Sequence, residues 1–557
     1  MRTILHWSVV LLAVLVAPPV AAQVENVPVT NQVYEYLDRL AVRGLLPPYS
    51  NASIPLSRAT VASLLQAAET KRSAMTRAEE SFLEKFQREF AVELGRGIDN
   101  AYVLIGSEGA DESFARGTLS DREKFLFALV DSGATLFVEL LGSLEYRGAN
   151  GDSWGATGAT LASIGGRVRG TALGTLGYLL QSTNGRLWGD KTFALSDPTL
   201  AGNYKLNEPE SRFFDLTEAY IQLQLDWLNL QLGRERRVLG LGYSDRLLVS
   251  GTAPAFDFIK LGARYKAFSF TYFHGSLVRE TFLLPGLPDE AAENTNKYLA
   301  LHRFQFSPLD ALTVSLGEMV IYQRLAPELA YLIPVNFFKS AEHQLGDKDN
   351  AFLFLDVEVY PIRNLKLYGS WLIDDIDFAK WGTGWWGNQF GWQAGAYASN
   401  VLGIEDVDAL VEYARLEPYL YSNRLAGNSY THNEITIGHS LPPNADEWLL
   451  ELRYRPSSVL RLALGYRARR HGANVLEGDS LLRNVGGDAL EGHRPGDAET
   501  VTFLDGVLET EHRWQVRAAW EPITNLFVEG VAAYQRRRSM GTRRDDLLSA
   551  VRIRLEY

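Results

Sequence analysis

Residues 351–377 read AFLFLDVEVYPIRNLKLYGSWLIDDID and decide the fold. Apolar and polar side chains alternate along residues 352–360, and the alternation resumes along residues 365–373 after a tight turn at 361–364. A period of two places successive side chains on opposite faces of a strand. One face of this hairpin is therefore apolar, and the other carries acids such as Asp356. Strands with one wet and one apolar face, joined by a tight turn, are typical of an outer-membrane β-barrel.

The same pattern recurs along the chain. Alternation is clearest at residues 218–226, 228–232, 460–466, 512–520 and 551–557. Short turns that carry a proline join strands, at Pro308, Pro361, Pro456 and Pro522. Long polar connections lie between the hairpins, at residues 284–297, 324–350 and 472–506. By the usual asymmetry of such barrels, the short turns face the periplasm and the long connections face the outside.

The size of the barrel follows from the length of the chain. After residue 22 there is no run of about 18 apolar residues, the length that a spanning helix needs. A chain that crosses a membrane must then do so as a closed barrel. Roughly 440 residues, at about 24 per strand and connection, predict an all-β transmembrane barrel of 16 to 18 antiparallel strands, with an even number expected. We place it at residues 116–557. The last strand ends on Tyr557, and we expect the barrel assembly machinery to recognise that aromatic terminus.

The N-terminal part differs in kind. Residues 1–22 are typical of a secretory signal peptide, with a basic start, an apolar core and small residues before Gln23. In residues 23–115 apolar side chains fall at helical spacing, and Ser57 and Thr76 stand where helix N-caps are expected. We predict a small α-helical periplasmic domain there, in contact with a periplasmic or cell-wall component. Residues 36–59 also resemble half of an S-layer homology repeat, and an ordinary helical hairpin is the alternative.

Composition limits the compartment and the partners. A net charge of -12 argues against a nucleic-acid partner, whose phosphates demand a basic face. The chain has no cysteine, which fits an oxidising compartment and excludes a lipid anchor on an N-terminal cysteine. We therefore predict a protein of the outer membrane of a Gram-negative bacterium, surrounded by outer-membrane lipid.

Several stretches resemble the capsule-assembly Wzi family of outer-membrane proteins. They are residues 317–322, 327–338, 347–350, 367–375, 417–419, 431–433 and 438–446. Together they spread over most of residues 120–557. The resemblance implies an 18-stranded barrel, a periplasm-facing helical region and extracellular loops that hold exported polysaccharide at the cell surface. Its motif residues are Glu318, Pro327, Glu328, Tyr331, Pro334, Asn336, Asp349, Asn350, Asp374 and Asp375.

An aromatic run is the first candidate for binding polysaccharide. Residues 381–392, predicted to be a loop, bring Trp381, Trp385, Trp386 and Trp392 together among glycines. A broad apolar ring matches the C–H face of a pyranose. The alternative is the aromatic belt that barrels place at the membrane interface, and the sequence leaves both open.

Arginines are the second candidate set. Arg234, Arg236, Arg461 and Arg467 lie in or beside predicted strands, and in the lumen they would attract an acidic polysaccharide through charge-assisted bonds. The alternative is that they pair with lumen acids and brace the barrel.

Two acidic groups offer oxygen ligands for calcium. One is Asp347, Asp349 and Asn350, and the other is Asp374, Asp375 and Asp377. Neither has the spacing of a dedicated calcium loop, so solvated loops or salt bridges are the simpler interpretation. We predict no metal site and no cofactor.

Motifs of catalysis are missing from the sequence. There is no zinc-protease motif, nucleophile elbow or phosphate-binding loop, and adjacent His439 and Ser440 would point to opposite faces of a strand. We predict no catalytic residue and a non-enzymatic barrel that binds or organises exported capsular polysaccharide. A porin for sugars or other small solutes is the alternative, and a hydrolase with residues from different strands is a third. Connections 324–350 and 472–506 folded inward would favour the binder, and an open lumen the porin.

Overall fold

The computed structural model describes residues 23–105, 114–131, 133–278, 296–478 and 480–557. The predicted signal peptide lies outside these residues, as does most of the predicted connection at 284–297. Among the described residues no helix is long and apolar enough to cross a membrane.

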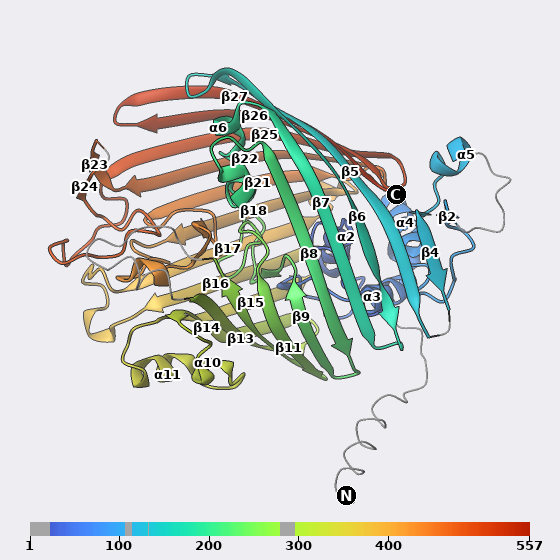
Figure 1. The fold of residues 1–557 in the computed structure, drawn as a ribbon, viewed down its shortest axis with the longest axis horizontal. Coiled ribbons are helices and arrows are strands. Elements are labelled where there is room, and N and C mark those ends of the chain that lie inside the picture. The colour runs from blue at the N-terminus through green and yellow to red at the C-terminus, as the bar shows by residue number, and fades with distance from the viewer. Residues whose placement is uncertain (1–22, 106–113, 132, 279–295, 479) are drawn as a thin grey trace, which may run out of the picture.

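Eighteen strands of the described residues close into an antiparallel barrel, which confirms the predicted fold class and strand number (Figure 1). In chain order they are β5 (Thr135–Gly151), β6 (Gly155–Ala172), β7 (Leu176–Gly189), β8 (Phe213–Gln224), β9 (Leu228–Arg234), β11 (Asp257–Tyr265), β12 (Phe268–Leu277), β13 (Asn296–Leu309), β14 (Leu312–Arg324), β15 (Asn350–Ile362), β16 (Leu365–Asp375), β17 (Gln389–Ser399), β18 (Val407–Leu416), β21 (Ala445–Tyr454), β22 (Leu460–Ala473), β25 (Val507–Ile523), β26 (Leu526–Ser539) and β27 (Thr542–Glu556). The ring closes where β27 pairs with β5, and beyond that pairing the Tyr557 backbone N–H donates to the Leu140 carbonyl at 2.8 Å.

The hairpin β15–β16 has the predicted faces. Asp356 and Glu358 are each 1% exposed and point into the barrel, whereas Leu355 is 38% exposed on the outer wall. The predicted turn at residues 361–364 is too long. Pro361 lies within β15 and the turn is only Arg363–Asn364, because the register shifts between Val359 and Ile362 and leaves a place where a missing N–H costs no ladder bond.

Helices α2 (Val33–Val42), α3 (Arg58–Glu69) and α4 (Arg77–Glu89) form the N-terminal part. The Ser57 hydroxyl caps α3 by accepting the Thr60 N–H, and Thr76 and Glu79 form a capping box at α4, as predicted. Apolar side chains from the three helices, among them Leu37, make one buried core. Shorter elements are β1 (Ser53–Ile54), η1 (Arg72–Ala74), β2 (Tyr102–Val103), α5 (Phe114–Thr118), β3 (Lys124–Phe125), β4 (Phe127–Val130), β10 (Val238–Leu239), η2 (Phe378–Lys380), η3 (Val401–Gly403), η4 (Ala426–Asn428), β19 (Thr431–His432), β20 (Ile435–Thr436), β23 (Val475–Glu477) and β24 (Ser480–Arg483).

The helices dock on the short-turn end of the barrel through buried charge pairs. Arg39 is 2% exposed, and its guanidinium reaches Glu79 at 3.1 Å, Asp406 at 3.0 Å and also Asp408. Asp406 lies in the turn between β17 and β18 and Asp408 in β18. A similar group joins Lys366 of β16 to Asp38 of α2 at 3.0 Å. The helical region is therefore fixed to the barrel at this end.

Two connections fill part of the lumen. They are residues 235–256, between β9 and β11, and residues 417–444, between β18 and β21. Their side chains, such as Leu248 and Tyr430, share one core with the inward-facing Leu301 of β13. The sequence analysis considered two other connections for this role, and one of them, residues 472–506, contributes Ala489 to the same core. The connection at 324–350 packs on the outer wall instead.

Candidate functional site

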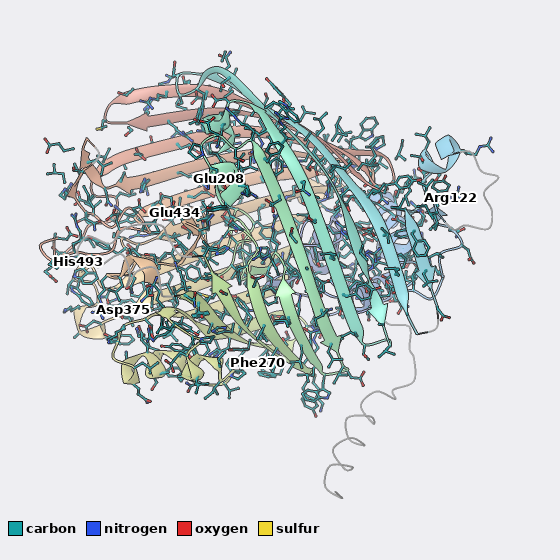
Figure 2. All side chains as sticks on the ribbon, viewed as in Figure 1. Arg122, Glu208, Phe270, Asp375, Glu434 and His493 are labelled. Atoms are coloured by element: carbon teal, nitrogen blue, oxygen red, sulfur yellow. The ribbon has the colours of Figure 1, made fainter. Side chains whose placement is uncertain are left out.

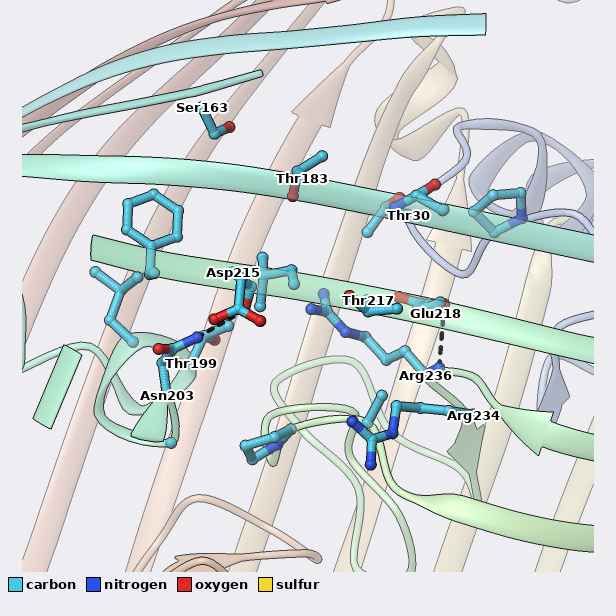
Figure 3. A pocket seen from close by; sticks show the side chains of 18 of the residues that line it. Thr30, Ser163, Thr183, Thr199, Asn203, Asp215, Thr217, Glu218, Arg234 and Arg236 are labelled. Carbon is cyan, nitrogen blue, oxygen red and sulfur yellow. Dashed lines mark hydrogen bonds between the residues drawn. The ribbon is translucent and has the colours of Figure 1, made fainter. Parts of the chain in front are cut away.

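A cavity of about 1010 Å³ lies inside the barrel, on the side of β5–β8 (Figure 3). Its walls are the inner faces of these strands, the N-terminal residues 26–30 and part of the segment 235–256. The connection between β7 and β8 also lines it, and this connection is one of those on the long-loop side of the barrel.

Three short helices shape that connection: α6 (Lys191–Ala194), α7 (Pro198–Ala201) and α8 (Tyr204–Asn207). Each begins at an Asx residue whose side chain accepts a backbone N–H, as N-caps do, at Asp190, Asp197 and Asn203. Apolar side chains of the helices pack against the inner wall, among them Leu200 beside Phe214 of β8. This packing fixes the polar residues of α7 and α8 at the cavity.

Most arginines that line the cavity are held by carboxylates. Arg147 pairs with Asp197 at 2.7 Å, Arg167 with Glu139 at 2.7 Å and Glu556 at 3.0 Å, Arg552 with Glu145 at 2.6 Å, and Arg554 with Glu556 at 2.6 Å. Arg167–Glu139 and Arg552–Glu145 join neighbouring strands and brace the wall, Arg147–Asp197 ties β5 to the β7–β8 connection, and Arg554 and Glu556 lie on the same strand.

Arg236, just after β9, differs from these arginines. Its backbone N–H donates to Glu218 at 3.3 Å, but its guanidinium has no ion pair within the described chain, and its buried Nε has no hydrogen-bond partner there. The carboxylates of Asp215 and Glu529, which also line the cavity, have no partner of either kind among the described residues. Figure 3 shows the Arg236 side chain extending toward Thr217 on β8. The cavity thus offers donors and acceptors that no protein group uses.

The cavity extends around a free edge of β8. Strand β9 pairs with β8 only along residues 219–224, so residues 213–218 have no strand partner on that side. Asn203 covers one point of the edge, where its Nδ2 donates to the Asp215 carbonyl at 2.8 Å. Asp215 and Leu216 point to opposite faces of the strand, and both line the cavity.

The four predicted arginines do not form one site. Arg234 lines the cavity beside Arg236, but both of its terminal contacts go to Asp257, at 2.9 Å. Arg461 and Arg467 lie on β22, away from the cavity, and pair with Glu35 at 3.3 Å and Glu447 at 3.4 Å. Of the set, only Arg236 has an uncommitted guanidinium.

The predicted loop at 381–392 is too long. It ends before β17, and Trp392 lies within that strand, where it stacks on Trp371 of β16 with ring centres 4.9 Å apart and planes 8° apart. Trp392 is 37% exposed and shares the outer face with Ala394 and Ala396. Residues 389–399 alternate between the two faces of the sheet, as a strand does. The glycines near Trp392 made this stretch resemble a loop in the sequence, which is why the loop was predicted to extend too far.

The other three tryptophans lie in the connection between β16 and β17. Trp381 packs against Phe390, with ring centres 5.3 Å apart. Trp385 lies next to Trp386, and the Trp386 ring stacks on His493 at 3.9 Å and 6°. Trp385 and Trp386 therefore lie against the long connection between β22 and β25, whereas Trp381 packs on β17, and none of the three lines the cavity.

The family-motif residues hold the connection between β14 and β15, which contains α10 (Leu329–Leu332) and α11 (Phe338–Gln344). The Glu318 carboxylate accepts the Phe338 N–H at 2.7 Å, and Asp349 accepts both Arg324, at 2.9 Å, and the Tyr331 hydroxyl, at 2.7 Å. Further contacts run from the Glu328 N–H to the Tyr322 hydroxyl, from Asn336 to the Ala330 carbonyl, from Asn350 to the Asn428 carbonyl, from the Tyr421 N–H to Asp374, and from Lys339 to Asp375. Pro327 and Pro334 lie in the same connection.

One group of side chains has the composition of a metal site. Ligand atoms of Glu342, His343 and Asp347 lie within 4.8 Å of one another, among the residues described. Glu342 is already paired with Lys339 at 2.9 Å, and burial raises the pKa of Glu342 to about 7. A carboxyl that holds its proton near neutral pH, beside a cation, is a poor ligand, and we assign no metal to it.

The fold brings His439 to Ser244, with 3.3 Å between Nε2 and Oγ. The His439 Nδ1 accepts the backbone N–H of Leu441 at 3.0 Å, so the proton of a neutral ring lies on Nε2. The Ser244 hydroxyl in turn donates to Glu412. The histidine therefore faces the serine with a proton rather than with a lone pair, which is the wrong polarity for activating a nucleophile.

Comparisons with known proteins agree with this architecture. The model of the family "Capsule assembly protein Wzi" matches residues 161–546. Among solved structures, Wzi of Escherichia coli is similar at a TM-score of 0.55 and 12% identity, covering 96% of this chain and 99% of that one. It is described as an outer-membrane, carbohydrate-binding β-barrel involved in group 1 capsule assembly.

Two porins resemble the chain less. OccK5 of Pseudomonas aeruginosa has a TM-score of 0.42 and 13% identity over 76% of this chain and 98% of that one. A BenF-like porin of Pseudomonas fluorescens has a TM-score of 0.44 and 9% identity over 76% and 99%. No curated protein sequence matches the chain. The family model spans more than half of the residues, so this outer-membrane barrel belongs to the Wzi family of capsule assembly proteins.

Proposed function

We propose that this barrel binds exported capsular polysaccharide at the cell surface without chemically changing it. The observation that carries the proposal is the cavity, in which the guanidinium of Arg236 and the carboxylates of Asp215 and Glu529 have no partner among the described residues. The Arg236 Nε is buried and Glu529 is half-buried, and such groups gain from a ligand that replaces the hydrogen bonds they lose to water, whereas Asp215 is exposed at the edge of the cavity. The E. coli relative is described as carbohydrate-binding, which supports the same ligand class here.

The charge of these groups favours hydroxyl-rich sugar units over carboxylate-rich ones. Most cavity arginines already have carboxylate partners, and the groups left over are one guanidinium and more than one carboxylate. Carboxylates accept hydrogen bonds from sugar hydroxyls and repel an anionic sugar. A polymer of mixed composition would therefore present neutral units to the cavity.

A pore is less well supported than a binding site. The segments 235–256 and 417–444 share a dry core inside the barrel, and the helical region docks on its short-turn end. Transport of a solute would require both to move. The proposal also divides the chain into a periplasmic helical domain at residues 23–115 and the barrel at 116–557, with Tyr557 as the signal for the assembly machinery.

The proposal includes the absence of catalysis, and the geometry of Ser244 and His439 supports this part of it. A nucleophile needs an unprotonated base nitrogen facing its hydroxyl, and here that nitrogen is turned to the Leu441 N–H. His432, which lines the cavity, likewise accepts a backbone N–H, from Val278 at 2.9 Å.

The test measures the fraction of surface polysaccharide shed into the medium by cells with and without the protein. We expect increased shedding at constant total synthesis without it. A variant with Arg236→Gln and Glu218→Gln should shed more than wild type, whereas Arg483→Gln, which removes an exposed pair with Asp505, should not. An unchanged shed fraction in the deletion strain contradicts the proposal, and conductance of the purified barrel would then test the porin.

A further inference from the structure

The connection between β14 and β15 folds over the outside of the barrel. Tyr331 of α10 and Phe338 of α11 share a buried core with Tyr298 and Val320. Figure 1 shows α10 and α11 at the margin of the barrel beside β14. The connections 235–256 and 417–444 turn into the lumen instead, so this arrangement needs an explanation.

Strand register identifies the covered face as the outer one. In the β13–β14 pair, Tyr298 lies opposite Tyr322 and Phe304 lies opposite Leu316. Side chains two residues apart share a face, so all of these project to the side of Leu316, which is 54% exposed. Leu301 of β13 is an odd number of residues from Tyr298 and Phe304, so its side chain projects to the opposite face, where it joins the lumen core.

A polar pair lies beneath the connection on that outer face. Glu318 and His302 are opposite each other, are 2% and 4% exposed, and have 3.3 Å between carboxylate and imidazole. The Phe338 ring packs on His302 with centres 4.5 Å apart, and the Phe338 N–H bonds to Glu318. On a bare lipid-facing wall such a pair would be costly. The connection shields it.

The side of the connection that faces away from the barrel is apolar. Six exposed side chains lie on it, with the exposed fraction in parentheses: Leu325 (73%), Leu329 (75%), Leu332 (38%), Ile333 (51%), Val335 (71%) and Phe337 (59%). They continue an apolar surface that Phe306, Leu316 and Leu355 begin on the outer wall. In water an apolar patch of this extent is unfavourable and marks an interface.

The height of the wall shows what covers the patch. Below Glu318, the apolar outer face of β14 is Leu312–Leu316, about 16 Å along the strand and about 12 Å along the membrane normal at a tilt near 45°. A lipid band is about 25 Å tall. Continuing to Tyr322 gives about 36 Å along the strand and about 26 Å of height. The part of the wall that the connection covers therefore belongs to the lipid band.

We propose that residues 325–337 are embedded in the outer leaflet of the outer membrane, where their apolar side chains contact lipid acyl chains. Glu318 and Asp349 anchor the two ends of the connection to the barrel through α11 and Tyr331. The segment widens the hydrophobic belt of the barrel on this side, and it does so independently of any polysaccharide.

The chain has no cysteine, so single cysteines can carry a spin label without background. The test compares Val335→Cys with Leu316→Cys on the outer wall and Leu476→Cys on the 59%-exposed hairpin of the β22–β25 connection. Each labelled protein is reconstituted in phospholipid vesicles, and collision with oxygen, which concentrates in lipid, is compared with collision with a water-soluble nickel chelate.

We expect the label at 335 to behave as the label at 316 does, with oxygen collision dominant. Nickel collision as strong as at 476 would place the segment in water and overturn the proposal. Protection of the label from both reagents, together with spin–spin broadening, would mean that a second copy of the chain covers the patch. That outcome would also overturn the proposal. Glu318→Gln, which keeps the size of the side chain but removes its charge, should raise nickel collision at 335 by loosening α11. Retention of heat-modifiable gel mobility verifies that each barrel is folded.

Discussion

The two ends of this barrel use the same kinds of charged residue in opposite ways. At the short-turn end Arg39 is 2% exposed and meets Glu79, Asp406 and Asp408 (Figure 2 shows all side chains). At the cavity Arg236 has no ion-pair partner in the described parts of the chain. A saturated, buried arginine fixes two parts of a protein together, and an unsaturated one at a cavity keeps its hydrogen bonds for a ligand. Partners, rather than residue type, decide the role.

The largest expected effect is at the saturated end. Arg39→Ala removes the cation that joins Glu79 of α4 to Asp406 and Asp408 of the barrel, while Glu79 keeps Arg43 and Asp408 keeps Arg455. Docking of the helical region should therefore weaken by at most about 3–5 kcal/mol. Hydrogen exchange of the α2 and α4 amides should become faster. As a control, Arg72→Ala removes a pair with Glu84 that is 35% and 55% exposed, and exposed pairs contribute little to stability. Equal exchange in both variants would show that the buried group does not hold the helices.

A smaller effect is expected at the cavity, and on binding rather than on stability. Arg236→Gln breaks no ion pair, so the free energy of unfolding should change by less than about 0.5 kcal/mol. Loss of a charged hydrogen bond should weaken polysaccharide binding about tenfold or more. Titration calorimetry with purified polysaccharide measures it. Arg234→Gln is the matched variant, since Asp257 already occupies that guanidinium, and it should weaken binding less. A larger loss of binding in Arg234→Gln than in Arg236→Gln would contradict the assignment of Arg236 as the arginine that is free to bind the ligand.

The smallest effect separates the tryptophans. Trp386→Ala, in the connection between β16 and β17, should weaken binding by about 1 kcal/mol, or roughly fivefold, if sugar rings stack there. Trp392→Ala should leave binding unchanged because that ring stacks on Trp371 on the outer wall. Binding curves that respond to Trp392 and not to Trp386 would contradict the assignment of the two rings.

Patterns within short stretches of the sequence correctly predicted strand faces and helix starts, which depend mainly on neighbouring residues. The alternation around Asp356 gave the correct faces, and the caps at Ser57 and Thr76 gave the starts of two helices. The length of the chain allowed 16 to 18 strands, and the family resemblance implied the 18 that the structure has. The aromatic run was assigned wrongly at its end, because glycines beside Trp392 resemble a loop although every second residue faces the wall.

The site could not be predicted in the same way, because it depends on contacts between distant segments. Arg234 and Arg236 are two residues apart and look alike in the sequence. One faces Asp257 across the β9–β11 pair, and the other lies beyond the end of β9. The cavity takes residues 26–30, the α7–α8 connection and the free edge of β8, which no sequence pattern links. Asp215 and Glu529 were missed for this reason.

The docking of the helices has a consequence for the order of folding. Arg39 and Asp406 are 367 positions apart in the chain, and Lys85 and Glu521, which also pair across this interface, are 436 apart. Closing such long loops is slow. The segment that the ribosome makes first can therefore complete its contacts only after β18 and β25 have been made and placed. Docking of the helices on the barrel therefore requires that nearly all of its strands have already formed.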